Sequence, residues 1–196
     1  MTELRTIEIA DTTLRDGEQT SGVSFSASEK LSIARKLIEK VGVDRVEIAS
    51  ARVSKGEFEC VGKVCQWASS AGFIERIEVL GFCDNGTSID WISSAGGKVI
   101  NLLCKGSERH CRGQLGKSPE EHWQDVLGNI SLATSRGMLV NVYLEDWSNG
   151  IKDNPSYVMG MMDFLSGKAK VCRYMLPDTL GILSPTDTET YISMMV

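Results

Sequence analysis

The stretch "TIEIADTTLRDGEQTSG" (residues 6–22) places an alternating apolar segment directly before a run of charged and amide side chains. Its first six residues, TIEIAD, have the alternation and the β-branched content of a strand. The polar run that follows contains Asp11, Arg15, Asp16 and Gln19. We therefore expect a strand that ends in a strongly polar loop, and the reason for so much charge at a strand end is the question that decides the fold.

Strand-like and helix-like segments alternate along the rest of the chain. The next segment, "SASEKLSIARKLIEKVG", repeats apolar residues on one helical face from Leu31 to Ile38, with Ser26 or Ser28 as the N-cap. Pro119 suits the first turn of a later helix. Further strands are expected at residues 43–50, 76–83, 98–106, 138–146 and 170–179, and further helices at about 54–70, 87–95, 118–137, 154–168 and 184–196.

Six such β/α pairs build either a doubly wound sheet or a barrel. No GxGxxG motif follows the first strand, which disfavours a nucleotide-binding open sheet. Polar residues instead follow almost every strand, and in a barrel all these ends converge on one catalytic face. The expected fold is therefore α/β, a TIM (β/α)8 barrel of which this chain encodes about six units, with these residues at the strand ends: Asp11, Asp16, Glu47, Ser50, Asp84, Ser107, His110, Glu145, Asp146, Asp178 and Thr179.

Composition favours small-molecule chemistry. The chain has 196 residues, 42% hydrophobic and 24% charged, and its net charge of -5 offers no basic face for nucleic acid and no polybasic segment for a membrane. No apolar run approaches the ~20 residues of a membrane span, and the acidic start does not resemble a signal peptide. We expect a cytoplasmic protein whose six scattered cysteines are buried thiols.

Five motifs together resemble a known family. They are "DTTLRDGEQ", the strand "VDRVEIAS", "SERH" followed by "LGKS", "LEDWSNG" and "LPDTLGILSP". They are similar to the metal-dependent Claisen-condensing TIM barrels, the 2-isopropylmalate, citramalate and homocitrate synthases, and look closest to citramalate synthases. The resemblance implies an enzyme that joins the methyl carbon of acetyl-CoA to the ketone of a 2-keto acid and then hydrolyses the thioester.

The resemblance also implies roles for the first loop. Asp16 matches a ligand of a divalent metal, Mg, Mn or Zn, which polarises the ketone. Arg15 matches the arginine that stabilises negative charge on the ketone oxygen. From the residues alone, Arg15 and Asp16 could instead form a loop ion pair. Asp11 either supports the site or bonds the turn, and Gln19 either reaches a substrate carboxylate or solvates the loop.

Further roles follow from the later motifs. Thr179 matches a threonine that binds the keto-acid carboxylate, or else simply ends a strand, and Asp178 orients its loop. Glu145 matches an acid that takes part in proton transfer or orders a water. Glu47 either supports the site or is a buried partner of Arg15 or Arg52. Where the family continues with alanine or threonine and then arginine, this chain has Trp147, Ser148 and Asn149.

Specificity is expected from the apolar residues near the ends of the third to fifth strands. Leu80, Leu103 and Tyr143 would leave a small space that fits a methyl group, which favours pyruvate as the keto acid, although the leucines could equally be core layers. His110 matches a family position that could contact substrate, or it is a solvated loop residue.

The family's metal site is completed by an H-x-H pair on a seventh strand, which the sequence does not contain. Its two histidines, His110 and His122, are twelve residues apart and cannot replace that pair. We therefore expect residues 1–196 to be the N-terminal part of a catalytic domain, inactive alone, and the full-length protein to be a homodimer. The alternatives are a 2-isopropylmalate or homocitrate synthase, a lyase or carboxyltransferase on the same barrel, and an inactive fragment.

Overall fold

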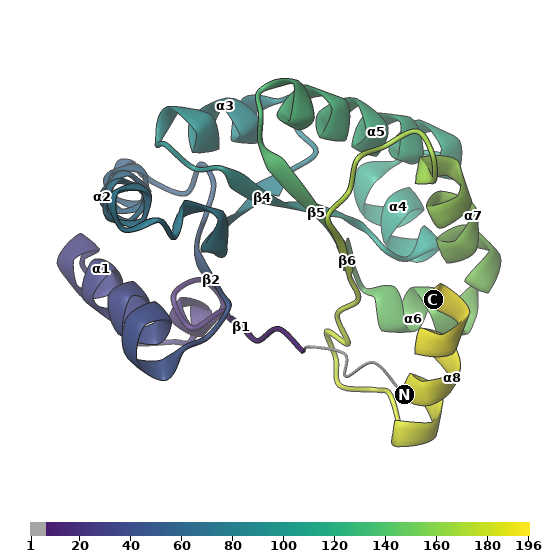
Figure 1. Cartoon of the computed structure of the whole chain (residues 1–196). Coiled ribbons are helices and arrows are strands. Elements are labelled where there is room, and N and C mark those ends of the chain that lie inside the picture. Colours follow the sequence, from purple (N-terminus) through teal and green to yellow (C-terminus); the bar gives the residue numbers. More distant parts are fainter. Residues whose placement is uncertain (1–6) are drawn as a thin grey trace, which may run out of the picture. The chain divides into compact units, whose positions relative to one another are not determined.

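The computed structural model describes residues 7–196, and strands and helices alternate along them (Figure 1). The α/β class and the six strands predicted from the sequence are confirmed. The strands form one sheet in the order β1-β2-β3-β4-β5-β6. Strand β1 pairs with β2, β2 with β3 and β5 with β6, each time in parallel. The strands are β1 Ala10–Asp11, β2 Arg45–Ser50, β3 Ile77–Phe82, β4 Val99–Lys105, β5 Leu139–Glu145 and β6 Arg173–Met175.

All predicted helices are present, and two short ones were not predicted. The unpredicted helices are α4 and α6, which lie in segments for which the sequence predicted no helix. The α-helices are α1 Ala27–Lys36, α2 Lys55–Ala71, α3 Thr87–Ser94, α4 Glu108–Leu115, α5 Pro119–Ser135, α6 Trp147–Asp153, α7 Pro155–Leu165 and α8 Pro185–Met195. Two 3-10 turns, η1 Gly17–Gln19 and η3 Ile74–Arg76, and a π-helical turn, η2 Leu37–Val41, complete the elements.

Helix starts follow the capping signals in the sequence. Ser26 is the N-cap of α1: its hydroxyl accepts the Glu29 N–H at 3.3 Å, and the Glu29 carboxylate accepts the Ser26 N–H at 2.8 Å. This reciprocal pair satisfies two backbone donors that the helix would otherwise leave unpaired. Ser118 caps α5 through the same reciprocal pair with Glu121, and Pro119 is the first residue of that helix. The capping serine of α1 is therefore Ser26 and not Ser28.

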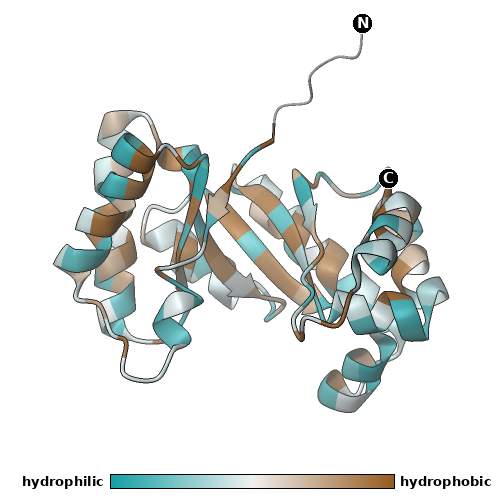
Figure 2. Cartoon of the chain, turned by 90° about the horizontal axis from the view of Figure 1, so that it is seen from below, coloured by the Kyte–Doolittle hydropathy of each residue, from teal (hydrophilic) through white to brown (hydrophobic). Residues whose placement is uncertain are grey.

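The chain forms two compact units. The first contains the residues up to Gly81 together with Thr87–Ile100, and the second contains Phe82–Gly86 with Asn101–Val196. The strands are mostly hydrophobic, whereas the helices carry both kinds of residue (Figure 2). Strands β2 and β3 are buried almost throughout, as expected for parallel strands covered on both faces.

Both outer strands are shorter than predicted. Strand β1 begins at Ala10, while Ile7 and Ile9 are exposed; Thr6, the first residue of the predicted strand, lies outside the described residues. Strand β6 ends at Met175 rather than at Thr179. Within residues 7–196 each has one neighbour in the sheet order, so its ladder is bonded on one side only in the described part of the chain. Hydrophobic and β-branched content cannot reveal how many neighbours a strand has.

The six cysteines are free thiols. Four are buried, as predicted, but Cys83 is half-buried and Cys172 is exposed, so the prediction was wrong for Cys172. Burial raises the pKa of Cys60 to about 11 and that of Cys65 to about 12, which makes both poor nucleophiles at neutral pH. None of the helices in residues 7–196 is long and apolar enough to cross a membrane.

Candidate active site

The loop after β1, in the first unit, is a compact hydrogen-bonded turn. The Thr12 carbonyl accepts the N–H groups of Arg15, Asp16 and Gly17 at 3.1, 2.8 and 3.2 Å. The Asp11 carboxylate accepts the N–H of Thr13 at 3.0 Å and its hydroxyl at 3.1 Å, so it bonds the turn. The intervening Leu14 is fully buried. These contacts fix the backbone that carries Arg15 and Asp16.

The Arg15 guanidinium binds two carboxylates of different exposure. Its Nε donates to Glu47 Oε2 at 2.5 Å, and its Nη1 donates to Asp16 Oδ1 at 2.6 Å. The Glu47 side chain is 1% exposed and that of Asp16 is 60% exposed. Arg15 is therefore a partner of Glu47, as one of the two interpretations from the sequence expected. The Arg15–Asp16 ion pair exists, and it leaves the Asp16 carboxylate largely open to solvent.

Arg15 and Gln19 border a hollow of about 320 Å³ on the first unit. The opposite wall comes from the β2–α2 connection, so the first two strand ends of this unit share one hollow. Gln19 is exposed, and its N–H donates to the Asp16 carbonyl at 3.0 Å. The lining residues are Arg15, Glu18, Gln19, Ser24, Ser50, Val53, Ser54 and Glu57. Leu80 is not among them; it is buried in β3, where its carbonyl accepts the Ala51 N–H at 2.7 Å.

A buried lysine beside this hollow was missed by the sequence reasoning. Lys30 of α1 is fully buried, and its ammonium contacts Glu18 Oε2 at 2.5 Å and the two Glu57 oxygens at 2.9 and 3.0 Å. Burial lowers the pKa of Lys30, but the hydrogen bonds and charges of Glu18 and Glu57 outweigh it and raise the pKa above its ordinary value. The available signal was a lysine one turn before Ala34 on the apolar face of α1.

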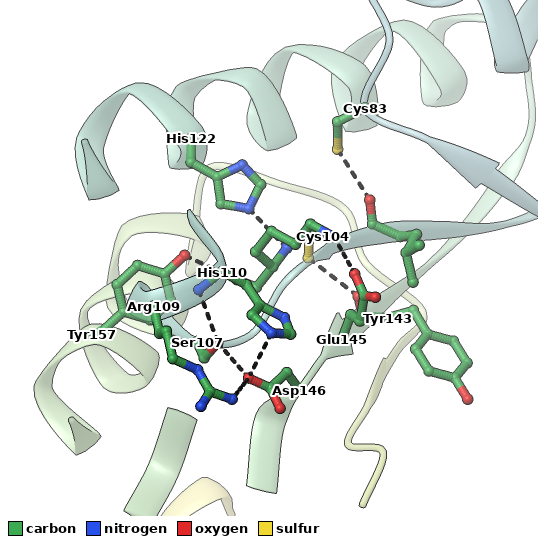
Figure 3. A network of polar contacts seen from close by, with 12 residues as sticks. Cys83, Cys104, Ser107, Arg109, His110, His122, Tyr143, Glu145, Asp146 and Tyr157 are labelled. Carbon is green, nitrogen blue, oxygen red and sulfur yellow. Dashed lines mark hydrogen bonds and ion pairs between the residues drawn. The ribbon is translucent and has the colours of Figure 1, made fainter. Parts of the chain in front are cut away.

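The second unit carries a polar network at the ends of β4 and β5 (Figure 3). The Lys105 ammonium forms an ion pair with Glu145 Oε2. The Lys105 N–H donates to His122 Nε2 at 2.9 Å, and the Tyr157 hydroxyl donates to the Lys105 carbonyl at 2.9 Å. Sequence reasoning placed Glu145 here but missed Lys105, His122 and Tyr157, because their contacts join segments 17 to 52 residues apart.

The half-buried residues of β4 and β5 lie on one face of these strands. Leu103 and Lys105 alternate with buried residues in β4, and Tyr143 and Glu145 do so in β5. Because side chains alternate between the faces of a strand, each pair points to the same side. Two of the predicted specificity residues, Leu103 and Tyr143, therefore share a face of their own strands with the charged pair.

Asp146 is the centre of a second cluster in the same network. Its carboxylate accepts hydrogen bonds from Ser107 Oγ at 2.7 Å and Asn149 Nδ2 at 2.6 Å. Arg109 Nη2 also donates to its Oδ2, at 3.2 Å. Burial raises the pKa of this carboxyl, but these hydrogen bonds and the charge of His110 outweigh it, so the pKa lies below its ordinary value. The backbone of Asp146 is left-handed, with φ at 64°.

His110 lies on helix α4 and not in a loop, so that part of the prediction was wrong. Ser107 caps this helix by accepting the His110 N–H at 3.3 Å, and Gly116 ends it. His110 Nε2 lies 3.5 Å from Asp146 Oδ2. The imidazole therefore faces the cluster and is not a freely solvated group.

Asp178 and Thr179 lie in the turn after β6. The Asp178 carboxylate accepts the N–H groups of Ile182 and Leu183, both at 3.0 Å, and these bonds lower its pKa. Thr179 is exposed and lies four residues beyond the end of β6, so it does not end the strand. Asp178 thus orders the turn that presents Thr179.

The residues described here do not complete a metal site. Asp16 offers an exposed carboxylate, but no group of three or more histidine, cysteine, aspartate or glutamate side chains within residues 7–196 is placed to hold a metal ion. One carboxylate competes poorly with the hydration shell of a divalent ion.

Comparison with known proteins places these features in a family. The HMGL-like family profile matches residues 6–196. The probable 2-isopropylmalate synthase of Ignicoccus hospitalis is 33% identical over 97% of this chain and 45% of its own length. The (R)-citramalate synthase of Methanocaldococcus jannaschii is 30% identical over 93% of this chain and 35% of its own length. This chain thus spans less than half the length of these two curated relatives.

Solved structures share the fold. The HMG-CoA lyase of Bacillus subtilis superposes with a TM-score of 0.67 at 17% identity, over 98% of this chain and 64% of that one. An HMG-CoA lyase from Acinetobacter baumannii, solved with coenzyme A and 3-methylmalate, gives a TM-score of 0.67 at 14% identity, over 96% and 61%. At these identities the likeness supports the fold alone. With the family match over residues 6–196, it follows that the chain belongs to the HMGL-like family.

Proposed function

We propose that these residues belong to the catalytic domain of a synthase that condenses acetyl-CoA with a 2-keto acid. The reaction joins the acetyl methyl carbon to the ketone carbon, and water then releases CoA to leave a 2-hydroxy diacid. The observation that carries the proposal is the similarity of over nine-tenths of the chain to 2-isopropylmalate and citramalate synthases. The arrangement of Arg15 between Glu47 and Asp16 supports it.

Arg15 is the proposed catalytic residue of the first unit. Its two-pronged contact with carboxylates shows a guanidinium held in place before substrate binds, as stabilisation of a developing oxyanion requires. Glu47 and Asp11 position it, the first by the ion pair and the second by bonding the turn. Gln19, which borders the same hollow, is proposed to bind the substrate.

Glu145 is the proposed catalytic residue of the second unit. It takes part in proton transfer from the acetyl methyl group or orders a water for thioester hydrolysis. Thr179 is proposed to bind the keto-acid carboxylate through its hydroxyl, with Asp178 holding its turn. His110 is proposed as a further substrate contact.

Pyruvate is the proposed keto acid and citramalate the proposed product. Leu103 and Tyr143 present apolar surface on the face of the strands that also carries Glu145, and Leu80 is proposed as a third contact. A small apolar space favours a methyl over an isopropyl group, although one methylene discriminates by only about 1 to 3 kcal/mol.

Asp16 is the proposed ligand of a divalent metal, Mg, Mn or Zn. When bound, such an ion acts as a Lewis acid on the ketone oxygen. Because the described residues do not complete its coordination, the roles given above are those of the protein side chains alone. We further propose a cytoplasmic homodimer that acts on small molecules, without nucleic acid or membrane partners.

The test is a substrate screen on the purified protein, expressed as its gene encodes it. CoA release from acetyl-CoA is followed with pyruvate, 2-oxoisovalerate or 2-oxoglutarate, with and without added Mg²⁺, Mn²⁺ or Zn²⁺. Pyruvate is expected to give the highest kcat/KM. Faster release with 2-oxoisovalerate would identify a 2-isopropylmalate synthase, and cleavage of an added hydroxyacyl-CoA without synthesis would favour the lyase alternative.

A further inference from the structure

Lys105, at the end of β4, is held from both sides by side chains that the proposed chemistry does not use. His122 is 1% exposed, and burial lowers its pKa to about 4, so it is neutral near pH 7 and its Nε2 can accept the Lys105 N–H. The buried Tyr157 binds the Lys105 carbonyl, and its ring lies 5.9 Å from that of Trp123. Both backbone polar groups of Lys105 are thus fixed by buried rings.

The ends of β4 and β5 are locked together at the same place. The Gly106 N–H donates to the Glu145 carbonyl at 2.7 Å, and a Cβ added at Gly106 would lie 2.6 Å from the Leu144 carbonyl oxygen. A Cβ at Gly150 would lie 1.9 Å from the Gly106 carbonyl oxygen. Only glycine fits at either position, and the resulting close approach sets the distance between the backbones of Lys105 and Glu145.

The residue after Glu145 is fixed as well. Asp146 has a left-handed backbone, which costs a non-glycine residue free energy and persists only where surrounding contacts impose it. Ser107, Arg109 and Asn149 supply those contacts through the Asp146 carboxylate. The backbone of Glu145 is therefore constrained at its carbonyl and at its next residue.

We propose that Lys105 is a positioning residue for Glu145. Its ammonium holds Glu145 Oε2 and thereby sets the orientation in which the carboxylate meets the acetyl-CoA methyl group or a water. A partly exposed ion pair contributes little to the stability of a fold, so stabilisation by the pair does not explain the contacts that fix Lys105 and Glu145. This inference rests on the proposed function of Glu145.

The experiment compares Lys105→Met, Lys105→Gln and Lys105→Arg in the protein as its gene encodes it. Lys105→Met and Lys105→Gln should lower kcat by about a hundredfold, because a small displacement of a catalytic group reduces the rate of the chemical step by about that factor. KM should change little. Lys105→Arg should recover most of the activity, since it restores a cation. Lys117→Met is the matched control, because Lys117 also pairs with a carboxylate, that of Asp125.

A double-mutant cycle separates positioning from general structure. If Lys105 acts through Glu145, Lys105→Met with Glu145→Gln should be no slower than Glu145→Gln alone. Additive losses, or a normal kcat in folded Lys105→Gln, would overturn the inference while leaving the proposed function intact. No CoA release by the wild-type protein with any keto acid would instead reject the proposed function, and this inference with it.

Discussion

Arg15 and Arg45 are two arginines of the first unit with almost the same surroundings. Arg15 pairs with Glu47 at 2.5 Å and Arg45 with Glu78 at 2.9 Å, and each glutamate is 1% exposed. Each arginine also reaches a more exposed carboxylate, Asp16 for Arg15 and Glu8 for Arg45, but of the two arginines it is Arg15 that lines the hollow of about 320 Å³. The difference between a structural and a catalytic arginine can therefore be tested within one chain.

We predict that Arg15→Lys lowers kcat by about a hundredfold, because an ammonium cannot reproduce the two-pronged guanidinium contact. Arg45→Lys, the matched control, should leave kcat within about threefold of wild type and change only stability. Steady-state kinetics and thermal melts of both variants provide the comparison. Normal turnover in Arg15→Lys would remove Arg15 from the proposed mechanism.

His122 makes stability depend on pH. Burial lowers its pKa from 6.5 to about 4, so between these values the unfolded state binds the extra proton and the folded state does not. The contribution of neutral His122 to the free energy of unfolding is therefore fully present above pH 6.5. Below pH 6.5 this contribution decreases by about 1.4 kcal/mol per pH unit, until pH 4 is reached.

We predict that His122→Gln removes this pH dependence, because glutamine keeps an acceptor for the Lys105 N–H but does not titrate. Urea unfolding at several values between pH 4 and pH 7 measures it, with His110→Gln as the control at the other histidine. Parallel stability curves for wild type and His122→Gln would contradict the assignment.

At the scale of elements, one buried ammonium ties three segments of the first unit together. Lys30 of α1 contacts Glu18 in η1 and Glu57 in α2. We predict that Lys30→Met lowers the free energy of unfolding by about 3 kcal/mol, because it leaves two carboxylates without their buried partner. Lys36→Met, an exposed position on the same helix, should change it by less than about 0.5 kcal/mol in urea titrations. Equal effects would mean that the cluster is not a buried charge network.

Two glycines inside helices, Gly150 of α6 and Gly128 of α5, differ in the space around them. We predict that Gly150→Ala destabilises the protein by about 3 kcal/mol, because its Cβ would lie 1.9 Å from the Gly106 carbonyl oxygen. Gly128→Ala, in the middle of α5 with nothing within 4 Å, should stabilise it by about 1 kcal/mol through helix propensity. Denaturant melts of both variants give the sign of each effect, and a tolerated Gly150→Ala would refute the tight packing of Gly106 against α6.

Elements with strong periodicity or clear caps could be predicted from the sequence, as α1, α2 and α5 show. The lengths of β1 and β6 could not, because strand length depends on neighbours in the sheet. Helix α4 was missed although Ser107 and Gly116 bracket it, because Cys111 and Leu115 are the only apolar side chains among its eight residues. The positions of Arg15 and Glu145 followed from motifs, whereas Lys30, Lys105 and His122 depend on contacts between distant segments, which local patterns do not encode.

At the scale of the whole molecule, the family match spans residues 6–196, and the proposed catalytic residues divide between the two units. Arg15 belongs to the first unit and Glu145 to the second, and each is held within its own unit by ion pairs. The central claim is that these residues serve the formation of a carbon–carbon bond.

Carbon-13 NMR of the reaction of methyl-labelled acetyl-CoA with pyruvate tests that claim most directly. We expect the label to appear in the methylene group of citramalate, with one CoA released for each molecule formed, and Arg15→Lys to slow both signals equally. Label found only in acetate would show thioester hydrolysis without condensation, and the protein would then not be a synthase of this kind.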